Sequence, residues 1–124
     1  MKSNLEKKKL GRLGEDIACA YLEKCGYTII RRNYTIRGGE IDVVAADDKN
    51  LVFVEVKCRE NDRFSRACEA VDGKKIAHLV NAAERFVFEN SNDAQISGKQ
   101  PRFDVVEVYT QKNLVNHIKA IDIN

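Results

Sequence analysis

The sequence predicts an α/β fold in which helices cover a central mixed sheet of about five strands. Two segments, one near the N-terminus and one beyond the middle of the chain, repeat apolar residues at helical spacing. The segments around them are short, rich in Val, Ile and Tyr, and bounded by turn residues, which is typical of β-strands. The expected order is helix, three strands, helix, two strands. An α+β sandwich is the alternative that element order alone leaves open.

Length and composition limit the architecture and the cellular setting. The chain has 124 residues, of which 44% are hydrophobic and 32% charged, which suits one globular domain over residues 1–124. No stretch approaches the roughly 18 consecutive apolar residues of a membrane span, and the charged start lacks an apolar signal core. We therefore expect a cytoplasmic protein without a membrane partner. A net charge of only +2 means that a nucleic acid would have to be held by local basic patches.

The first helix is predicted from about Lys7 to Cys25, and Gly26 follows as a helix-terminating residue. Gly14 falls near the centre of the apolar face, where a missing side chain would let the helix lie close to its neighbour. The apolar positions of that face are Leu10, Leu13, Ile17, Ala18, Tyr21 and Leu22.

Three strands are expected next, at residues 27–34, 40–46 and 51–57. Gly38 and Gly39 separate the first two and are most simply a turn, with close approach of a phosphate backbone as the lesser alternative. The sequence DDKN, residues 47–50, turns the chain between the second and third strands. Residues 58–70 show no clean period and are predicted to form a loop, which is a suitable place for substrate contacts.

The second half of the chain is predicted to contain a helix and two strands. The helix runs from a cap at Asp72 to about Glu89, and His78 falls on its polar face. The strands are residues 102–109, opened by Pro101, and residues 114–121. His78 and His117 are expected at the surface, because no Ser or Cys nucleophile is arranged around either.

One side of the strand at residues 102–109 carries two opposite charges. Arg102 and Asp104 alternate onto the same side. They either support a functional site or pair with each other.

The predicted hairpin carries four charges, Glu40, Asp42, Glu55 and Lys57, inside otherwise apolar strands. If the hairpin closes symmetrically about its turn, Ala46 pairs with Leu51. Asp42 then lies opposite Glu55, and Glu40 lies opposite Lys57. Because side chains alternate along a strand, all four charges project from one face. The other face takes Ile41, Val43, Val52, Val54 and Val56.

Two carboxylates placed directly opposite each other repel, because their Cβ atoms are only about 4.5–5.5 Å apart. A divalent cation would relieve that repulsion, since magnesium prefers oxygen ligands and commonly shares them with phosphates. The alternative is a partly exposed face on which Glu40 and Lys57 form a salt bridge while Asp42 and Glu55 reach solvent. The hairpin alone leaves both interpretations open. Glu15, at the edge of the first helix's apolar face, is a third carboxylate within helical reach of the sheet.

The motifs together resemble a known family. They are G-R-L-G-E-D-x-A at 11–18, G-Y-x-I-I-x-R-N-Y at 26–34, G-E-I-D at 39–42, F-V-E-V-K at 53–57, A-V-D-G-K-K at 70–75 and R-F-D-V-V at 102–106. This combination resembles the small bacterial YraN-like family, which is similar to the PD-(D/E)XK nuclease superfamily and, in its motifs, to archaeal Holliday junction resolvases. The resemblance covers nearly the whole chain and implies a restriction-endonuclease-like core. The proline that names the superfamily is absent, because Ile41 precedes Asp42.

The resemblance also implies roles for individual residues. Asp42 and Glu55 match the acidic metal ligands, Lys57 matches the lysine of the E-x-K element, and Glu15 matches the acidic residue of the first helix and is a candidate additional ligand. The metal would be Mg²⁺ or Mn²⁺. Lys75 matches the basic residue at the start of the second helix. The candidate nucleic-acid-binding residues are Lys75, Arg59, Lys74 and Arg37.

The function implied by the resemblance is a metal-dependent endonuclease acting on DNA, with branched or otherwise structured DNA as the expected substrate. Acidic neighbours are expected to raise the pKa of Lys57 and keep it an ammonium, so its expected roles are charge stabilisation and water orientation. The analogy with resolvases, whose two sites cut two strands, implies a homodimer. The alternatives are a nucleic-acid-binding module that no longer cuts and a structural domain whose hairpin charges form salt bridges.

Overall fold

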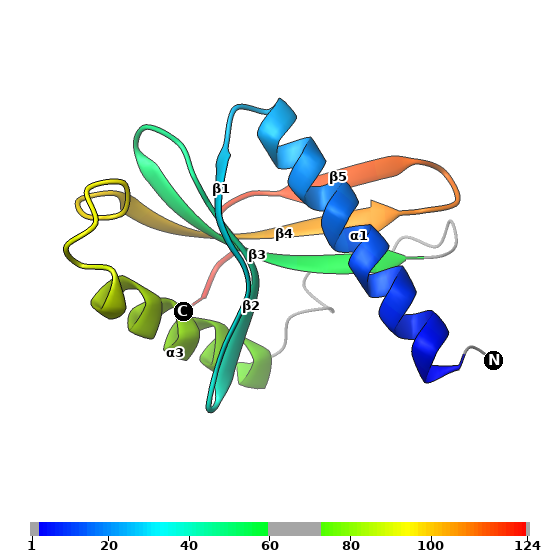
Figure 1. Cartoon of the computed structure of the whole chain (residues 1–124), viewed down its shortest axis with the longest axis horizontal. Helices are drawn as coiled ribbons and strands as arrows, with labels where there is room; N and C mark the ends of the chain where they lie inside the picture. Colours follow the sequence, from blue (N-terminus) through cyan, green and yellow to red (C-terminus); the bar gives the residue numbers. More distant parts are fainter. Residues whose placement is uncertain (1–2, 60–72, 124) are drawn as a thin grey trace.

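The computed structural model of the chain describes residues 3–59 and 73–123. A five-stranded mixed sheet lies between two helices, which cover opposite faces (Figure 1). This confirms the predicted α/β class and element order, and the arrangement is consistent with a restriction-endonuclease-like core. The elements are α1 (Asn4–Lys24), β1 (Thr28–Ile36), β2 (Gly39–Ala46), β3 (Asn50–Arg59), α3 (Gly73–Glu89), β4 (Gln100–Tyr109) and β5 (Leu114–Ile118).

The strands follow the chain order β1-β2-β3-β4-β5 across the sheet, so β3 is central. All neighbouring strands are antiparallel except β3 and β4, which are parallel because the connection between them includes α3. In Figure 1 the far end of the β1–β2 hairpin turns away from β3 and crosses the start of α3. No helix among residues 3–59 and 73–123 is long and apolar enough to cross a membrane.

The alternation of side chains along the strands divides the core into two layers. The layer under α1 consists of Ala18, Cys19, Leu22, Tyr27, Val43, Ala45, Val52, Val54, Val106 and Val108. The layer under α3 consists of Tyr34, Ile41, Val44, Ala46, Leu51, Phe53, Leu79, Ala82, Ala83, Phe86, Ile96, Phe103 and Val105. Burial of these side chains provides the main driving force for docking both helices on the sheet.

Helix α1 begins earlier than the periodicity predicts, because Ser3 caps it. The Ser3 hydroxyl accepts a hydrogen bond from the Glu6 backbone N–H at 3.1 Å. The early start carries the first turns past the edge of the sheet (Figure 1). Leu13, predicted on the apolar face, is 48% exposed.

Two glycines are required by close packing. A Cβ on Gly14 would lie 3.0 Å from the Cβ and Sγ of Cys58 on β3, which confirms the predicted close approach of α1. A Cβ on Gly39 would lie 2.5 Å from the His78 carbonyl oxygen of α3. The close approach at Gly39 is therefore made by the helix backbone, while Gly38 supplies the turn with a φ of 84°.

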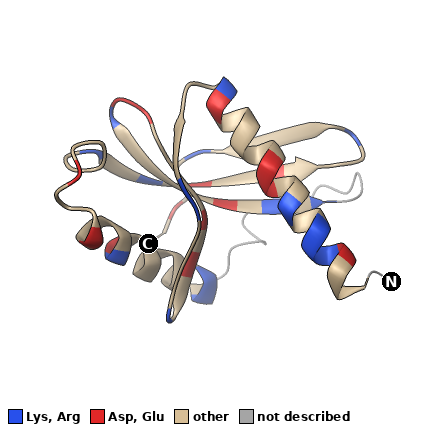
Figure 2. Cartoon of the chain, in the orientation of Figure 1, with Lys and Arg blue, Asp and Glu red and all other residues tan. Residues whose placement is uncertain are grey.

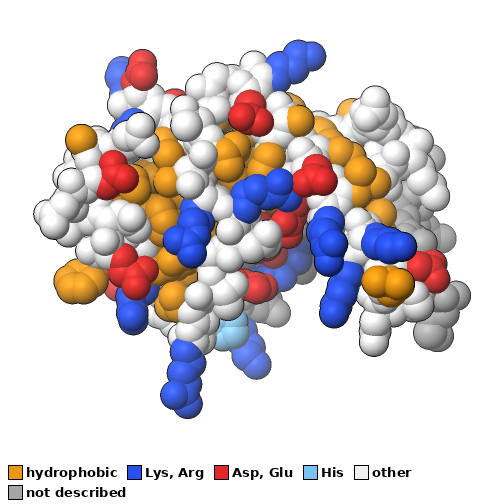
Figure 3. Space-filling model, in the orientation of Figure 1, with side chains coloured by type: hydrophobic (Ala, Val, Ile, Leu, Met, Phe, Trp, Pro, Cys, Tyr) orange, Lys and Arg blue, Asp and Glu red, His pale blue; other side chains and the backbone are white. Residues whose placement is uncertain are grey.

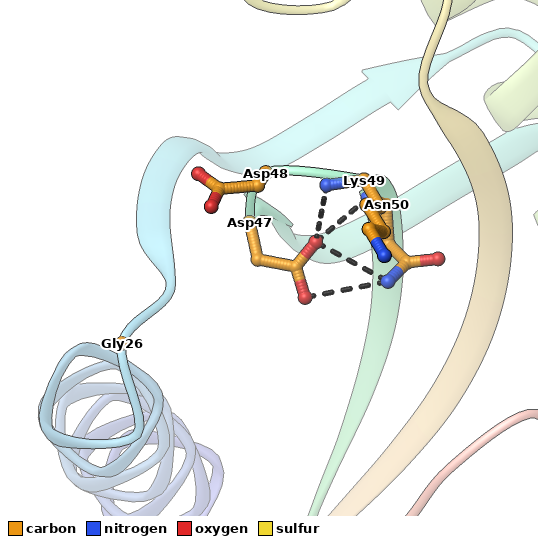
Figure 4. Close-up of a pocket in the computed structure, with 5 residues that line it drawn as sticks. All are labelled: Gly26, Asp47, Asp48, Lys49 and Asn50. Atoms are coloured by element: carbon orange, nitrogen blue, oxygen red, sulfur yellow. Dashed lines mark hydrogen bonds between the residues drawn. The ribbon is translucent and has the colours of Figure 1, made fainter.

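The β2–β3 turn is closed by the Asp47 side chain, whose Oδ1 accepts hydrogen bonds from the backbone N–H groups of Lys49 and Asn50 (Figure 4). The distance to Asp47 Oδ1 is 2.9 Å from the Lys49 nitrogen and 2.7 Å from the Asn50 nitrogen. Ala46 pairs with Leu51, so the predicted register of this end of the hairpin is confirmed. The pairing continues to Val43 and Val54.

The remaining boundaries differ in small ways from the predicted ones. The predicted cap Asp72 and most of the predicted loop 58–70 lie outside the described residues, although β3 itself extends to Arg59. Strand β5 ends at Ile118, before the predicted end at Ile121. Ala120 has a φ of 55°, and its N–H donates to Asp104 Oδ1 rather than continuing the sheet.

Candidate active site

The β2–β3 hairpin opens at Asp42, and we call this point the fork. The last pair of the ladder on this side is Val43 with Val54. One residue further on, Asp42 Oδ2 accepts a hydrogen bond from the Val56 backbone N–H at 2.8 Å. A side-chain carboxylate thus satisfies a strand N–H where the backbone ladder stops. The regular pairing of Asp42 with Glu55 and of Glu40 with Lys57 is therefore not part of the ladder.

The fork also breaks the alternation of side chains along β2. Val43 packs in the layer under α1, whereas Ile41 packs in the layer under α3. The prediction that Ile41 and Val43 share one face is therefore wrong. On the neighbouring strand, Asn33 has a φ of 53°, which marks an irregularity in β1 beside Asp42. Asp42 consequently lies at the point in β2 where the regular alternation of side chains between the two core layers is broken.

The environment of Asp42 penalises its negative charge. Burial raises the pKa of this carboxyl to about 7, and Glu55, Glu15 and Glu40 add to the effect, while the Val56 N–H opposes it. The shift supports the predicted repulsion between Asp42 and Glu55. A carboxyl group with this pKa is half protonated near neutrality and gains strongly from a nearby cation.

Glu55 is buried, with 5% of its surface exposed, and is stabilised by two ammonium groups. Glu55 Oε1 lies 3.4 Å from Lys57 Nζ on the same strand and 2.9 Å from Lys75 Nζ on α3. Because α3 begins at Gly73, Lys75 lies in its first turn and reaches Glu55 on the sheet. Figure 2 shows acidic positions on β2 and β3 and basic positions on β3 and at the start of α3. The structure thus brings Asp42, Glu55, Lys57 and Lys75 together.

The prediction that acidic neighbours raise the pKa of Lys57 is wrong. Burial lowers the pKa of this ammonium, and the adjacent Lys75 lowers it further, which outweighs the attraction of Glu55. Burial also acts to lower the pKa of Lys75, but its contacts with Lys57 and Glu55 raise it overall. Of the two lysines, Lys75 therefore has the higher pKa and holds its proton more tightly.

Glu15 approaches the fork from α1 but is engaged by an arginine. Its side chain is 18% exposed, and its Oε1 lies 3.6 Å from Arg32 Nη2. The same guanidinium donates to Asp16 at 2.8 Å. Glu15 acts on the pKa of Asp42 from this position.

The donor chemistry of the fork suits a hard divalent cation. Asp42 and Glu55 supply carboxylate oxygens, which Mg²⁺ and Mn²⁺ prefer. Within residues 3–59 and 73–123, however, no three His, Cys, Asp or Glu side chains are grouped closely enough to hold a metal ion. The carboxylate pair of Asp42 and Glu55 is therefore the part of the predicted ligand set that fits.

Basic side chains surround this acidic centre. Figure 3 shows acidic side chains between the lower half of α1 and the β1–β2 hairpin, with basic side chains on either side. Lys74 and Arg37 are exposed, as a nucleic-acid-binding role requires. Arg59 is more enclosed, because its Nε lies 3.8 Å from Glu107 Oε2 and its side chain is only 28% exposed.

Glu107 is a charged residue of this region that sequence reasoning missed. It is 1% exposed, aligns with Lys57 in the β3–β4 ladder and accepts a hydrogen bond from Asn116 Nδ2 at 3.0 Å. The sequence signal for a buried charge was an acidic residue inside the apolar run VVEVY. Its position beside Lys57 depends on the parallel register of β4 with β3, which the sequence does not reveal.

His117 belongs to a buried network on the α1 side of the sheet, so its predicted surface position is wrong. Its imidazole is 4% exposed; Nε2 lies 2.7 Å from Asp104 Oδ2 and Nδ1 lies 3.0 Å from the Tyr21 hydroxyl. Arg102 donates to both oxygens of Asp104 at 2.9 Å, so these two residues do pair with each other. The network ties α1, β4 and β5 together. His78, in contrast, is exposed as predicted.

The chain is similar to members of one uncharacterised protein family. Residues 14–108 match the model of "Uncharacterised protein family UPF0102". A UPF0102 protein of Caldicellulosiruptor bescii is 43% identical over 116 residues, which cover 92% of this chain and 94% of the relative. A UPF0102 protein of Carboxydothermus hydrogenoformans is 40% identical over 119 residues, covering 94% and 98%. One of Clostridioides difficile is 36% identical over 114 residues, covering 92% and 96%. The chain therefore belongs to the uncharacterised protein family UPF0102, the YraN-like family that its motifs resemble.

Proposed function

We propose that this protein is a metal-dependent endonuclease that cleaves phosphodiester bonds in DNA, with branched or structured DNA as its substrate. The observation that carries the proposal is the fork itself. Asp42 and Glu55, two enclosed carboxyl groups that repel each other, stand beside Lys57 and Lys75 where β2 leaves β3. Acidic residues that bind cations and lysines that bind phosphate are the two parts that phosphodiester hydrolysis needs.

The residues of the fork divide the chemistry between them. Asp42 and Glu55 would hold Mg²⁺ or Mn²⁺, and Glu15 would have to leave its contact with Arg32 to serve as a further ligand. When bound, the ion polarises the scissile phosphate and lowers the pKa of an attacking water. Lys57 donates a hydrogen bond to a non-bridging phosphate oxygen and neutralises charge that develops on it. Lys75 exchanges its contact with Glu55 for a second phosphate contact as the substrate enters.

One observation favours a different function. Glu55 already receives two ammonium groups, and the 2.9 Å contact with Lys75 neutralises it without a metal. A site arranged in this way also suits a nucleic-acid-binding module in which the lysines hold phosphate and no bond is broken. Both functions require DNA binding, and only the first requires metal-dependent cleavage.

Cleavage assays separate the two functions. Four-way junction, flap, duplex and single-stranded DNA are incubated with Mg²⁺, Mn²⁺ or chelator, using wild type, Asp42→Asn, Glu55→Gln and Lys57→Ala. We expect wild type to cut only with metal, and we expect each variant to lose at least about 100-fold in rate while still binding DNA. Asp48→Asn, which alters an exposed acid at the other end of the same hairpin, is the matched control and should cut normally.

The outcomes lead to clear decisions. Wild type that binds these DNAs but cuts none of them with either metal supports the binding module and ends the nuclease proposal. Asp42→Asn protein that cuts as fast as wild type removes the fork as the catalytic centre.

A further inference from the structure

A second basic site lies in the corner between the edge strand β1 and the C-terminal half of α3. A cavity of about 570 Å³ opens there, and its lining is mainly polar. Three arginines line it: Arg31 on β1, Arg37 in the β1–β2 turn and Arg85 on α3. The hairpin places this corner apart from the fork, since none of the fork residues Asp42, Glu55, Lys57 and Lys75 lines the cavity.

The arginines are organised by a buried tyrosine and a glutamate. Tyr34 is 4% exposed and its hydroxyl donates a hydrogen bond to Glu89 Oε1. Arg85 Nε donates to the other oxygen, Glu89 Oε2, at 3.1 Å. The Arg31 guanidinium lies over the Tyr34 ring, 5.3 Å from its centroid. Two of the three guanidinium groups thus have partners that orient them toward this cavity.

The charge balance of the corner identifies the ligand class. Glu89 offsets one of the three arginines, so the lining retains a net positive charge. A guanidinium group can donate two parallel hydrogen bonds to two oxygens of one phosphate. The cavity is open to solvent and polar, which suits a charged group that remains partly hydrated and disfavours an apolar ligand.

We propose that this corner, lined by Arg31, Arg37 and Arg85, binds a phosphate group of the nucleic-acid backbone away from the bond that is cut. The inference rests on the proposed function in one respect, namely that the substrate is a nucleic acid. A phosphate contact on the outer side of the hairpin fixes the strand relative to the fork and carries no sequence information. A free phosphate anion has the same chemistry and is distinguished below.

The test measures binding in the presence of chelator, so that it does not depend on cleavage. Fluorescence anisotropy with a labelled duplex gives the affinity of wild type and of the double variant Arg31→Gln/Arg37→Gln over a series of salt concentrations. We expect the double variant to bind about 10-fold more weakly at low salt and the slope of log K against log salt to fall by about 1. The control Lys24→Gln/Lys49→Gln removes the same charge from exposed positions elsewhere and should change affinity less than about 2-fold.

A variant that is expected to bind DNA more tightly distinguishes a lost contact from misfolding. Glu89→Gln keeps an oxygen that can accept the Tyr34 hydroxyl but removes the negative charge that competes for Arg85. We expect it to bind the duplex about 3-fold more tightly than wild type, which a damaged protein would not do. Titration of ¹⁵N-arginine-labelled protein with the duplex should shift the Nε–H signals of Arg31 and Arg85. Inorganic phosphate at the same phosphate concentration should shift them less.

Each outcome decides the matter. Equal affinity of the arginine double variant and the lysine control overturns the phosphate site, even when wild type cuts DNA. Signals that respond to inorganic phosphate and not to DNA overturn the nucleic-acid assignment in favour of a small anion. Wild type that binds DNA through Arg31 and Arg37 yet cuts nothing refutes the nuclease proposal and leaves this site standing.

Discussion

Lys75 Nζ, in the first turn of α3, lies 2.9 Å from Glu55 Oε1 on the central strand of the sheet. The contact joins the first turn of α3 to β3, in addition to the apolar packing of Phe86 on Phe53. It places a cation where the N-terminal end of a helix already favours negative charge. The Glu55 carboxylate is therefore stabilised by the ammonium and the helix together.

Replacing Lys75 should damage both stability and cleavage. Lys75→Met leaves the buried Glu55 with its ion pair to Lys57, so we expect a loss of about 1–2 kcal/mol in the free energy of unfolding. Cleavage of DNA should fall more steeply than binding. Lys24→Met, which removes the same charge from an exposed position on α1, is the matched control. Urea denaturation and the cleavage assay measure the two effects, and equal behaviour of both variants would contradict the role of Lys75.

The raised pKa of Asp42 makes stability depend on pH in an unusual direction. The folded-state pKa of about 7 lies above the ordinary value of 3.8. Because the folded protein holds the proton more tightly than the unfolded chain, wild-type stability should fall as the pH rises from about 4 to about 7. Asp42→Asn lacks this group and should gain of order 2 kcal/mol over wild type at pH 8 without metal.

Denaturation at several pH values measures this difference. Asp48→Asn, at the exposed turn of the same hairpin, should follow wild type at every pH. A parallel pH dependence of wild type and Asp42→Asn would show that Asp42 is not the group responsible.

Metal binding should depend on the same carboxyl group. If Mg²⁺ or Mn²⁺ binds the ionised form of Asp42, as proposed, either ion should raise the melting temperature of wild type more than that of Asp42→Asn. The gain should be larger at pH 8 than at pH 6, because the pKa of Asp42 lies between them. Differential scanning fluorimetry with and without chelator measures the shifts. Identical shifts in the two proteins would mean that the ion binds elsewhere.

Two glycines of α1 should respond oppositely to alanine. A Cβ on Gly14 meets Cys58 at 3.0 Å, while a Cβ on Gly11 meets nothing within 4 Å. Gly11→Ala should therefore stabilise the protein by up to about 1 kcal/mol through helix propensity. Gly14→Ala should destabilise it by about 1–3 kcal/mol through overpacking against β3. Thermal denaturation of both variants tests the pair, and stabilisation by Gly14→Ala would show that α1 is free to move away from β3.

Acid should loosen the network around Asp104. Burial acts to raise the pKa of this carboxyl, but hydrogen bonds from His117, Arg102 and the Ala120 N–H outweigh it and lower the pKa. The stability gained from this shift is present above the ordinary pKa of 3.8 and is lost as the pH falls through the lower folded-state value. Asp104→Asn should cost about 2–3 kcal/mol at neutral pH and flatten the acid limb of the stability curve. An unchanged acid limb would assign acid unfolding to other carboxyl groups.

The sequence predicted the parts of the fold that local pattern controls. Helical spacing, turn residues and the hairpin register from Ala46 and Leu51 were enough to predict the order of the elements and to bring Asp42 and Glu55 near each other. The change of face between Ile41 and Val43 was not predictable, because strict alternation assumes a regular strand. The fork depends on an Asp side chain that binds the Val56 N–H and on an irregular partner strand at Asn33.

Residues whose surroundings come from distant strands were also predicted poorly. Glu107 is buried because β4 runs parallel to β3, and His117 is buried because β5 returns beneath α1. Neither pairing leaves a signal in the local sequence. The pKa of Lys57 was predicted with the wrong sign for a related reason, since the contribution of Lys75 requires the docking of α3.

The irregular edge strand β1 also bears on how copies of the chain behave at high concentration. Its ladder with β2 shifts between Ile29 and Arg31, and Asn33 within it has a positive φ of 53°. A regular outer strand presents a row of unpaired N–H and C=O groups on which further chains can add and grow into aggregates. Bulges twist that row, and the charges of Arg31 and Arg32 repel an incoming identical edge. The same irregularities that accompany the fork therefore protect the protein from polymerising through its own sheet.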